Sequence, residues 1–163
     1  MLRNEPPFQA LRLRRLGLVQ GFETMAAVAA YCLGLRMHAM HASLEELLLC
    51  NVALDTAAAM AAFADACITL RLRKLLLFNS HVAPAALPEL TRFIAAGALR
   101  ELSIDNDALY DEEVVQVFDE AHESTRLFVA AVQASALTML RLVNLGDLPA
   151  NVVEAAAFIN ARK

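Results

Sequence analysis

The sequence predicts an α/β fold in which a parallel sheet forms the concave face of a solenoid arc and helices form its convex face. Three observations lead to this fold. A strand-like phrase, Leu-x-x-Leu-x-(Leu/Ile)-x-(Asn/Gln), recurs five times along the chain. The stretches between its copies place apolar residues at helical spacing. A crossover between parallel strands is right-handed, so every connecting helix falls on the same side of the sheet.

The recurring phrase divides the chain into repeats. Its copies begin at Leu13, Leu44, Leu72, Leu99 and Leu137. The third copy reads Leu-Arg-Lys-Leu-Leu-Leu-Phe-Asn, and the fourth reads Leu-Arg-Glu-Leu-Ser-Ile-Asp-Asn. Self-similarity at a nearly constant period indicates a repeat architecture, in which each unit is covered by its neighbours.

This phrase resembles that of the leucine-rich repeat family, most closely the ribonuclease-inhibitor-like class with helical connectors. The resemblance extends from about Leu13 to the C-terminus and covers a short array of about five irregular repeats. It implies a repeat-protein scaffold without catalytic activity. It also implies that protein ligands are held on the concave sheet.

Each copy of the phrase predicts one strand. The predicted strands span residues 14–19, 45–50, 73–78, 100–105 and 138–143. A first connecting helix is expected from Thr24 to Gly34, leaving residues 35–43 as a surplus loop. The second is expected to begin at Asp55 or Thr56. Its buried stripe is predicted as Met60, Phe63, Ala64 and Cys67.

The later connecting helices follow from proline, glycine and acidic residues. Pro88 suits the start of a helix and Gly97 its end. Asp111, Glu112 and Glu113 suit the first turn of another, with Val114, Val117, Phe118 and Ala121 as its buried stripe. Residues 123–125 are expected to interrupt it, so that 127–134 form a second helix. A last helix is expected to begin near Asp147 and Pro149.

Side-chain alternation predicts where a partner would bind. If the leucines of each strand point to the helices, the third, fifth and seventh positions of the phrase point outward. A sheet face exposed to water should be polar, yet Leu48, Leu76 and Phe78 would lie together as an apolar patch typical of an interface. The predicted partner-binding residues are Glu46, Leu48, Cys50, Lys74, Leu76, Phe78, Glu101, Ser103, Asp105, Met139 and Arg141. The alternatives are that residues 35–43 or the N-terminal segment bury this face, or that it pairs two copies in a homodimer.

An amide column follows the strands. It consists of Gln20, Asn51, Asn79, Asn106 and Asn144. We expect these amides to form an internal ladder that satisfies backbone groups of neighbouring turns. A column that faces a ligand is the alternative, because turns select Asn for local backbone bonding in any case.

Composition limits the class of protein. The size predicts a single domain over residues 11–163 after a flexible lead-in at 1–10. The hydrophobic fraction is 58%, but the longest apolar run without charge, residues 25–35, is shorter than the roughly 18 residues of a spanning helix. A net charge of −4 gives no broad attraction to nucleic acid. Three cysteines, an odd number, favour a reducing cytoplasmic compartment.

No motif in the sequence predicts catalysis, a cofactor or a metal centre. His38 and His41 are three residues apart in the expected surplus loop, without a third ligand at zinc-site spacing. There is no phosphate-binding glycine loop and no nucleophile motif. We therefore predict a protein without enzymatic activity. The alternative is a small-molecule or metal-binding enzyme with its site around these two histidines.

Overall fold

The computed structural model of the chain describes residues 14–19, 44–54, 56–106 and 116–162. The sheet contains five parallel strands whose spatial order follows the chain. They are β1 (Arg15–Val19), β2 (Glu46–Cys50), β4 (Lys74–Val82), β5 (Glu101–Asn106) and β6 (Met139–Val143). A short strand β3 (Ala53–Leu54) pairs in parallel with the end of β4.

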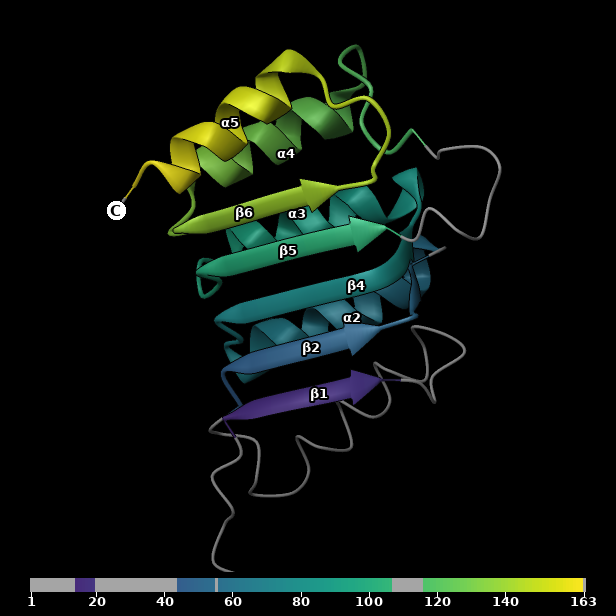
Figure 1. The fold of residues 1–163 in the computed structure, drawn as a ribbon, viewed down its shortest axis with the longest axis vertical. Coiled ribbons are helices and arrows are strands. Elements are labelled where there is room, and N and C mark those ends of the chain that lie inside the picture. The colour runs from purple at the N-terminus through teal and green to yellow at the C-terminus, as the bar shows by residue number, and fades with distance from the viewer. Residues whose placement is uncertain (1–13, 20–43, 55, 107–115, 163) are drawn as a thin grey trace, which may run out of the picture.

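The described helices form a layer beside the sheet (Figure 1). They are α2 (Ala57–Leu70), α3 (Leu87–Ala95), α4 (Glu123–Ala134) and α5 (Ala150–Asn160), with a short 3₁₀ turn, η1 (Pro84–Ala86), before α3. Consecutive helices pack on one another. In Figure 1, α2 and α3 lie behind the sheet, and α4 and α5 continue this layer at the β6 end. None of the four covers the sheet face turned to the viewer.

The five predicted strands are confirmed, and each begins one residue after its expected start. The register aligns equivalent positions of the phrase, so that Glu46 pairs with Lys74, Lys74 with Glu101, and Glu101 with Met139. One strand is longer than predicted. β4 continues four residues past Phe78, because its extension pairs with β3, which the phrase did not predict.

The core lies between the sheet and the helices. The inward leucines of the four adjacent strands are buried: Leu47, Leu75, Leu102 and Leu140. The predicted stripe of α2 is confirmed, since Met60, Phe63, Ala64 and Cys67 are all completely buried. Leu90, Phe93 and Ile94 of α3 are buried in the same way. Pro88 lies at the start of α3, and Gly97 follows its end with φ +81°, both as predicted.

Arg92 connects two neighbouring helices at the surface. Its guanidinium forms ion pairs with Glu89 of its own helix and with Asp65 of α2, both at 2.7 Å. The hydrogen bond to Glu89, followed by the one to Asp65, raises the pKa of Arg92 above its ordinary value. The ion pairs thus tie α3 to α2 outside the apolar core.

The prediction of a helix through Val117, Phe118 and Ala121 is wrong in the part that the structure describes. Residues 116–119 form neither helix nor strand, and Ala121 is exposed in a turn. Val117 and Phe118 are nevertheless buried. The Val117 N–H donates to the Leu145 carbonyl (3.2 Å), so this segment bonds to the turn after β6 instead of coiling.

Helix α4 begins four residues before its predicted start because its first turn is capped. The Ser124 N–H donates to His122 Nδ1 at 3.3 Å, which satisfies one of the free N–H groups of the first turn. Thr125, expected to interrupt the helix, is buried within it. Its Oγ1 accepts a hydrogen bond from the Asp119 N–H (3.1 Å), so the residue joins α4 to the segment that precedes it.

The last predicted helix is confirmed. It begins after Pro149 as α5 and buries Val152 and Ile159. The expected lead-in, the first connecting helix and the surplus loop at 35–43 lie outside the described residues. Across the described part of the chain, no helix combines the length and apolar character needed to cross a bilayer.

Candidate functional site

The sheet face opposite the helices carries the predicted partner-binding residues. We call it the outward face and define it by Glu46, Leu48, Cys50, Lys74, Leu76, Phe78, Glu101, Ser103, Asp105, Met139 and Arg141. The alternation that predicted it is confirmed on β2, where Leu47 and Leu49 are buried and the residues between them are half-buried. The same alternation holds from Lys74 to Phe78 on β4. The register aligns the equivalent outward positions of neighbouring strands, except that the pairing of β4 with β5 shifts between Leu77 and Ser80, so that Phe78 and Asp105 are not in register.

A charged row crosses the outward face at the first outward position of each strand. It consists of Arg15, Glu46, Lys74 and Glu101, in that order across β1, β2, β4 and β5. Arg15 Nε lies 3.0 Å from a carboxylate oxygen of Glu46, and Lys74 Nζ lies 2.5 Å from one of Glu101. On β6 the residue in register with Glu101 is Met139, which is half-buried and uncharged. Alternating signs on adjacent strands stabilise the pairing of these strands.

Apolar side chains occupy the centre of the outward face. Leu48 pairs in register with Leu76, and Cys50 pairs with Phe78. All four are half-buried, although alternation turns them away from the helices. They form one contiguous apolar surface over β2 and β4.

The outward face becomes polar over β5 and β6. Ser103 is only 2% exposed, and its hydroxyl has no hydrogen-bond partner among the described residues. It lies in register between Leu76 and Arg141, and Arg141 itself is exposed. At the ends of these two strands, Asn144 Nδ2 donates to a carboxylate oxygen of Asp105 (3.0 Å).

The amide column forms part of the expected internal ladder. Asn144 Nδ2 also donates to the Asn106 carbonyl (3.2 Å), and Asn106 Oδ1 accepts from the Val82 N–H (3.0 Å). These two links join the strand ends across β4, β5 and β6. Asn51, Asn79 and Asn144 have positive φ, between 45° and 58°, a conformation that Asn tolerates better than most residues. Gln20 lies outside the described residues.

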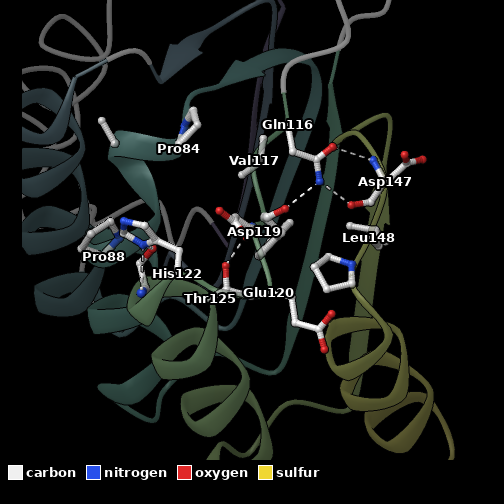
Figure 2. Close-up of a pocket in the computed structure, with 14 residues that line it drawn as sticks. Pro84, Pro88, Gln116, Val117, Asp119, Glu120, His122, Thr125, Asp147 and Leu148 are labelled. Atoms are coloured by element: carbon white, nitrogen blue, oxygen red, sulfur yellow. Dashed lines mark hydrogen bonds between the residues drawn. The ribbon is translucent and has the colours of Figure 1, made fainter.

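A cavity of about 720 Å³ opens where the strands end and the helices begin (Figure 2). Its walls come from the turn before α3, the segment before α4 (residues 116–122) and the turn before α5. The lining includes Pro84, Pro88, Gln116, Asp119, Glu120, His122, Thr125, Asp147 and Leu148. Sequence reasoning did not identify this cavity, because the three segments that form it are far apart in the chain.

Several polar groups that line this cavity form hydrogen bonds within the chain. Gln116 Nε2 donates to the carbonyls of Phe118 (2.6 Å) and Asp147 (2.5 Å), and its Oε1 accepts from the Asp147 N–H (3.0 Å). Figure 2 shows this amide clamped against Asp147. The Nδ1 of His122 caps α4. The side chains that a ligand would meet are therefore mainly prolines, Leu148 and the exposed carboxylates.

The histidines predicted as an alternative site, His38 and His41, lie outside the described residues. Over the ranges that the structure describes, no group of three or more His, Cys, Asp and Glu side chains could hold a metal ion. No protein-family model matches the chain, and comparisons with curated proteins and with solved structures returned no match.

Proposed function

We propose that the chain is a leucine-rich-repeat solenoid of the ribonuclease-inhibitor-like class, and that it is a non-catalytic module that binds a protein partner on its outward face. The observation that carries this proposal is the pairing of Leu48 with Leu76 and of Cys50 with Phe78 on a sheet face that none of the described helices covers. A contiguous apolar surface of this kind usually marks an interface.

The arrangement of the repeats supports the solenoid. Parallel strands follow one another in chain order, and successive helices stack beside them, as expected where each repeat contacts its neighbours. The amide links from Asn144 to Asn106 and from Asn106 to Val82 repeat the same kind of contact between adjacent units. A helical layer on the opposite side leaves the sheet as the binding wall.

The topology favours binding over catalysis. In open α/β sheets, cofactors and substrates bind where the strand order reverses direction. The described strands show no such reversal. The side-chain amide of Gln116 and the Nδ1 of His122, at the carboxyl edge of the sheet, form hydrogen bonds within the chain. A cytoplasmic location belongs to this proposal, because it agrees with the odd number of cysteines.

The test is a titration of a protein captured by the wild-type chain against wild type, Phe78→Ala and Phe158→Ala. We expect Phe78→Ala to weaken binding by about 2 kcal/mol or more, because interface energy concentrates in a few central, desolvated residues. Phe158 is the matched control, since it lies in α5 with 52% of its surface exposed. Phe158→Ala should leave the affinity unchanged.

Thermal melting separates a binding defect from a folding defect. Phe78→Ala should lower the melting temperature much less than Leu75→Ala, which truncates a completely buried side chain. Unchanged affinity for Phe78→Ala would contradict the proposed site. A loss of stability as large as that of Leu75→Ala would show instead that another part of the chain already covers the outward face.

A further inference from the structure

The charged row of the outward face is complementary to itself. From β1 to β5 it reads Arg15, Glu46, Lys74 and Glu101, alternately positive and negative. Two identical faces that meet around a twofold axis parallel to the strands present this row to each other in reverse order. Because the number of alternating charges is even, reversal places each positive side chain opposite a negative one.

All four charges have an opposite charge across the interface only when the axis lies between β2 and β4. There, Glu46 of one copy lies opposite Lys74 of the second copy, and Arg15 lies opposite Glu101. Each opposed pair forms twice, as in any isologous interface. The two ion pairs within each chain would thereby join into one network of alternating charge across the interface.

The same axis matches the apolar centre of the outward face. Leu48 lies opposite Leu76 of the second copy, and Cys50 lies opposite Phe78, so that apolar side chains meet apolar side chains. Gly17 lies opposite Ser103, and neither residue brings a charge to the apolar centre. The half-buried apolar centre thus becomes fully enclosed.

Other twofold axes produce mismatches. An axis on β4 places Lys74 opposite its own copy. An axis between β4 and β5 places Leu48 opposite Arg141 and Leu76 opposite Ser103. An axis perpendicular to the strands places the charged row opposite Cys50 and Phe78. Of these axes, only the one between β2 and β4 satisfies the charges and the apolar centre together.

We infer that the outward face binds a second copy of this chain, with the twofold axis between β2 and β4. This inference rests on the proposed function, because it names the partner of the same face. The face spans four short strands, which is small for a specific interface. We therefore expect association at about micromolar concentrations, at the weak end of specific interfaces.

Sedimentation velocity over a range of protein concentrations tests the inference by a charge swap. The average mass of the wild type should rise from 17.7 kDa toward twice that value. Lys74→Glu alone and Glu46→Lys alone each place two pairs of like charges across the axis. Each should weaken self-association by about 10-fold or more, because like charges facing each other are strongly unfavourable. An equimolar mixture of the two variants opposes unlike charges at all four positions and should dimerise as the wild type does.

The charge swap can be repeated at the outer strands with a second pair of variants, Arg15→Glu and Glu101→Lys. This pair replaces the first if a central variant fails to fold. Glu154→Lys, an exposed change on α5, is the control and should not affect association. A mixture that remains monomeric although both variants melt as the wild type does would overturn the inference. A wild type that stays at 17.7 kDa throughout would overturn it as well. In either case, the proposed function is tested separately by the titration of Phe78→Ala with another captured protein. Weakened binding would still support the proposed function, and unchanged binding would contradict it as well.

Discussion

The side-chain amide of Asn160 forms two hydrogen bonds with the backbone of Leu140. The Leu140 N–H donates to Asn160 Oδ1 (3.0 Å), and Asn160 Nδ2 donates to the Leu140 carbonyl (2.9 Å). In β6 the neighbouring residue, Met139, bonds to the preceding strand through its N–H. The polar groups of Leu140 therefore point to the other edge of β6, where unpaired groups would invite another strand. Asn160 satisfies them in place of a strand.

We predict that Asn160→Ala lowers the free energy of unfolding by about 1–2 kcal/mol, because two backbone groups lose their partners. Urea denaturation of both proteins measures this difference. Gln133→Ala is the control, since its side chain is exposed at the end of α4. Equal stability of Asn160→Ala and the control would show that water replaces the amide without cost.

Adjacent leucines on β4 should respond differently to truncation. Leu75 is completely buried against the helices, whereas Leu76 is half-buried on the outward face. Leu75→Ala should cost about 2–5 kcal/mol, as for other buried leucines. Leu76→Ala should cost clearly less in a dilute sample, where the outward face has no partner. Thermal melts of the two variants test the predicted sidedness, and the reverse order of stability would contradict it.

Two glycines with the same backbone conformation allow a matched comparison. Gly97 and Gly146 both have φ +81°, which costs any L-residue roughly 1–2 kcal/mol. A Cβ on Gly97 would find its nearest neighbour at 4.0 Å, but a Cβ on Gly146 would lie 2.5 Å from Gln116 Oε1. Gly146→Ala should therefore destabilise the chain more than Gly97→Ala in the same denaturation experiment. Similar losses of stability in the two variants would mean that the Gln116 side chain can move away from the added methyl group at little cost.

Two buried polar residues of β5 should have opposite effects when truncated. Asn106 accepts a hydrogen bond from the Val82 N–H, so Asn106→Ala should cost about 1–3 kcal/mol by leaving that group unsatisfied. The Ser103 hydroxyl is buried and has no partner within the described chain. Ser103→Ala should therefore be neutral or slightly stabilising. Chemical denaturation of both variants measures these changes in stability. A strong loss of stability in Ser103→Ala would indicate that this hydroxyl has a hydrogen-bond partner.

The repeated phrase was sufficient to predict the sheet. Buried leucines at fixed positions, such as Leu75 and Leu102, can face the helices in only one register, since a shift by one residue would turn them to the other side. The strand starts to within one residue, the parallel order of the strands and the sidedness of β2 and β4 therefore followed from the sequence. The buried stripe of α2 followed from helical periodicity in the same way.

Only the tertiary structure decided the segments whose conformation depends on distant partners. Val117 and Phe118 were expected in a helix, but they form none, and the Val117 N–H bonds to the backbone carbonyl of Leu145. No local sequence pattern predicts the hydrogen bonds between Asn160 and Leu140 or between Gln116 and Asp147, because these residues are far apart in the chain. Periodicity determines which face of a helix or strand is buried. Hydrogen bonds between segments distant in the chain determine the conformation of the turns and how the backbone groups at the edge of the sheet are satisfied. The sequence by itself thus determined the repeating strands and their outward face, and the fold decided the cavity, the cap of β6 and the start of α4.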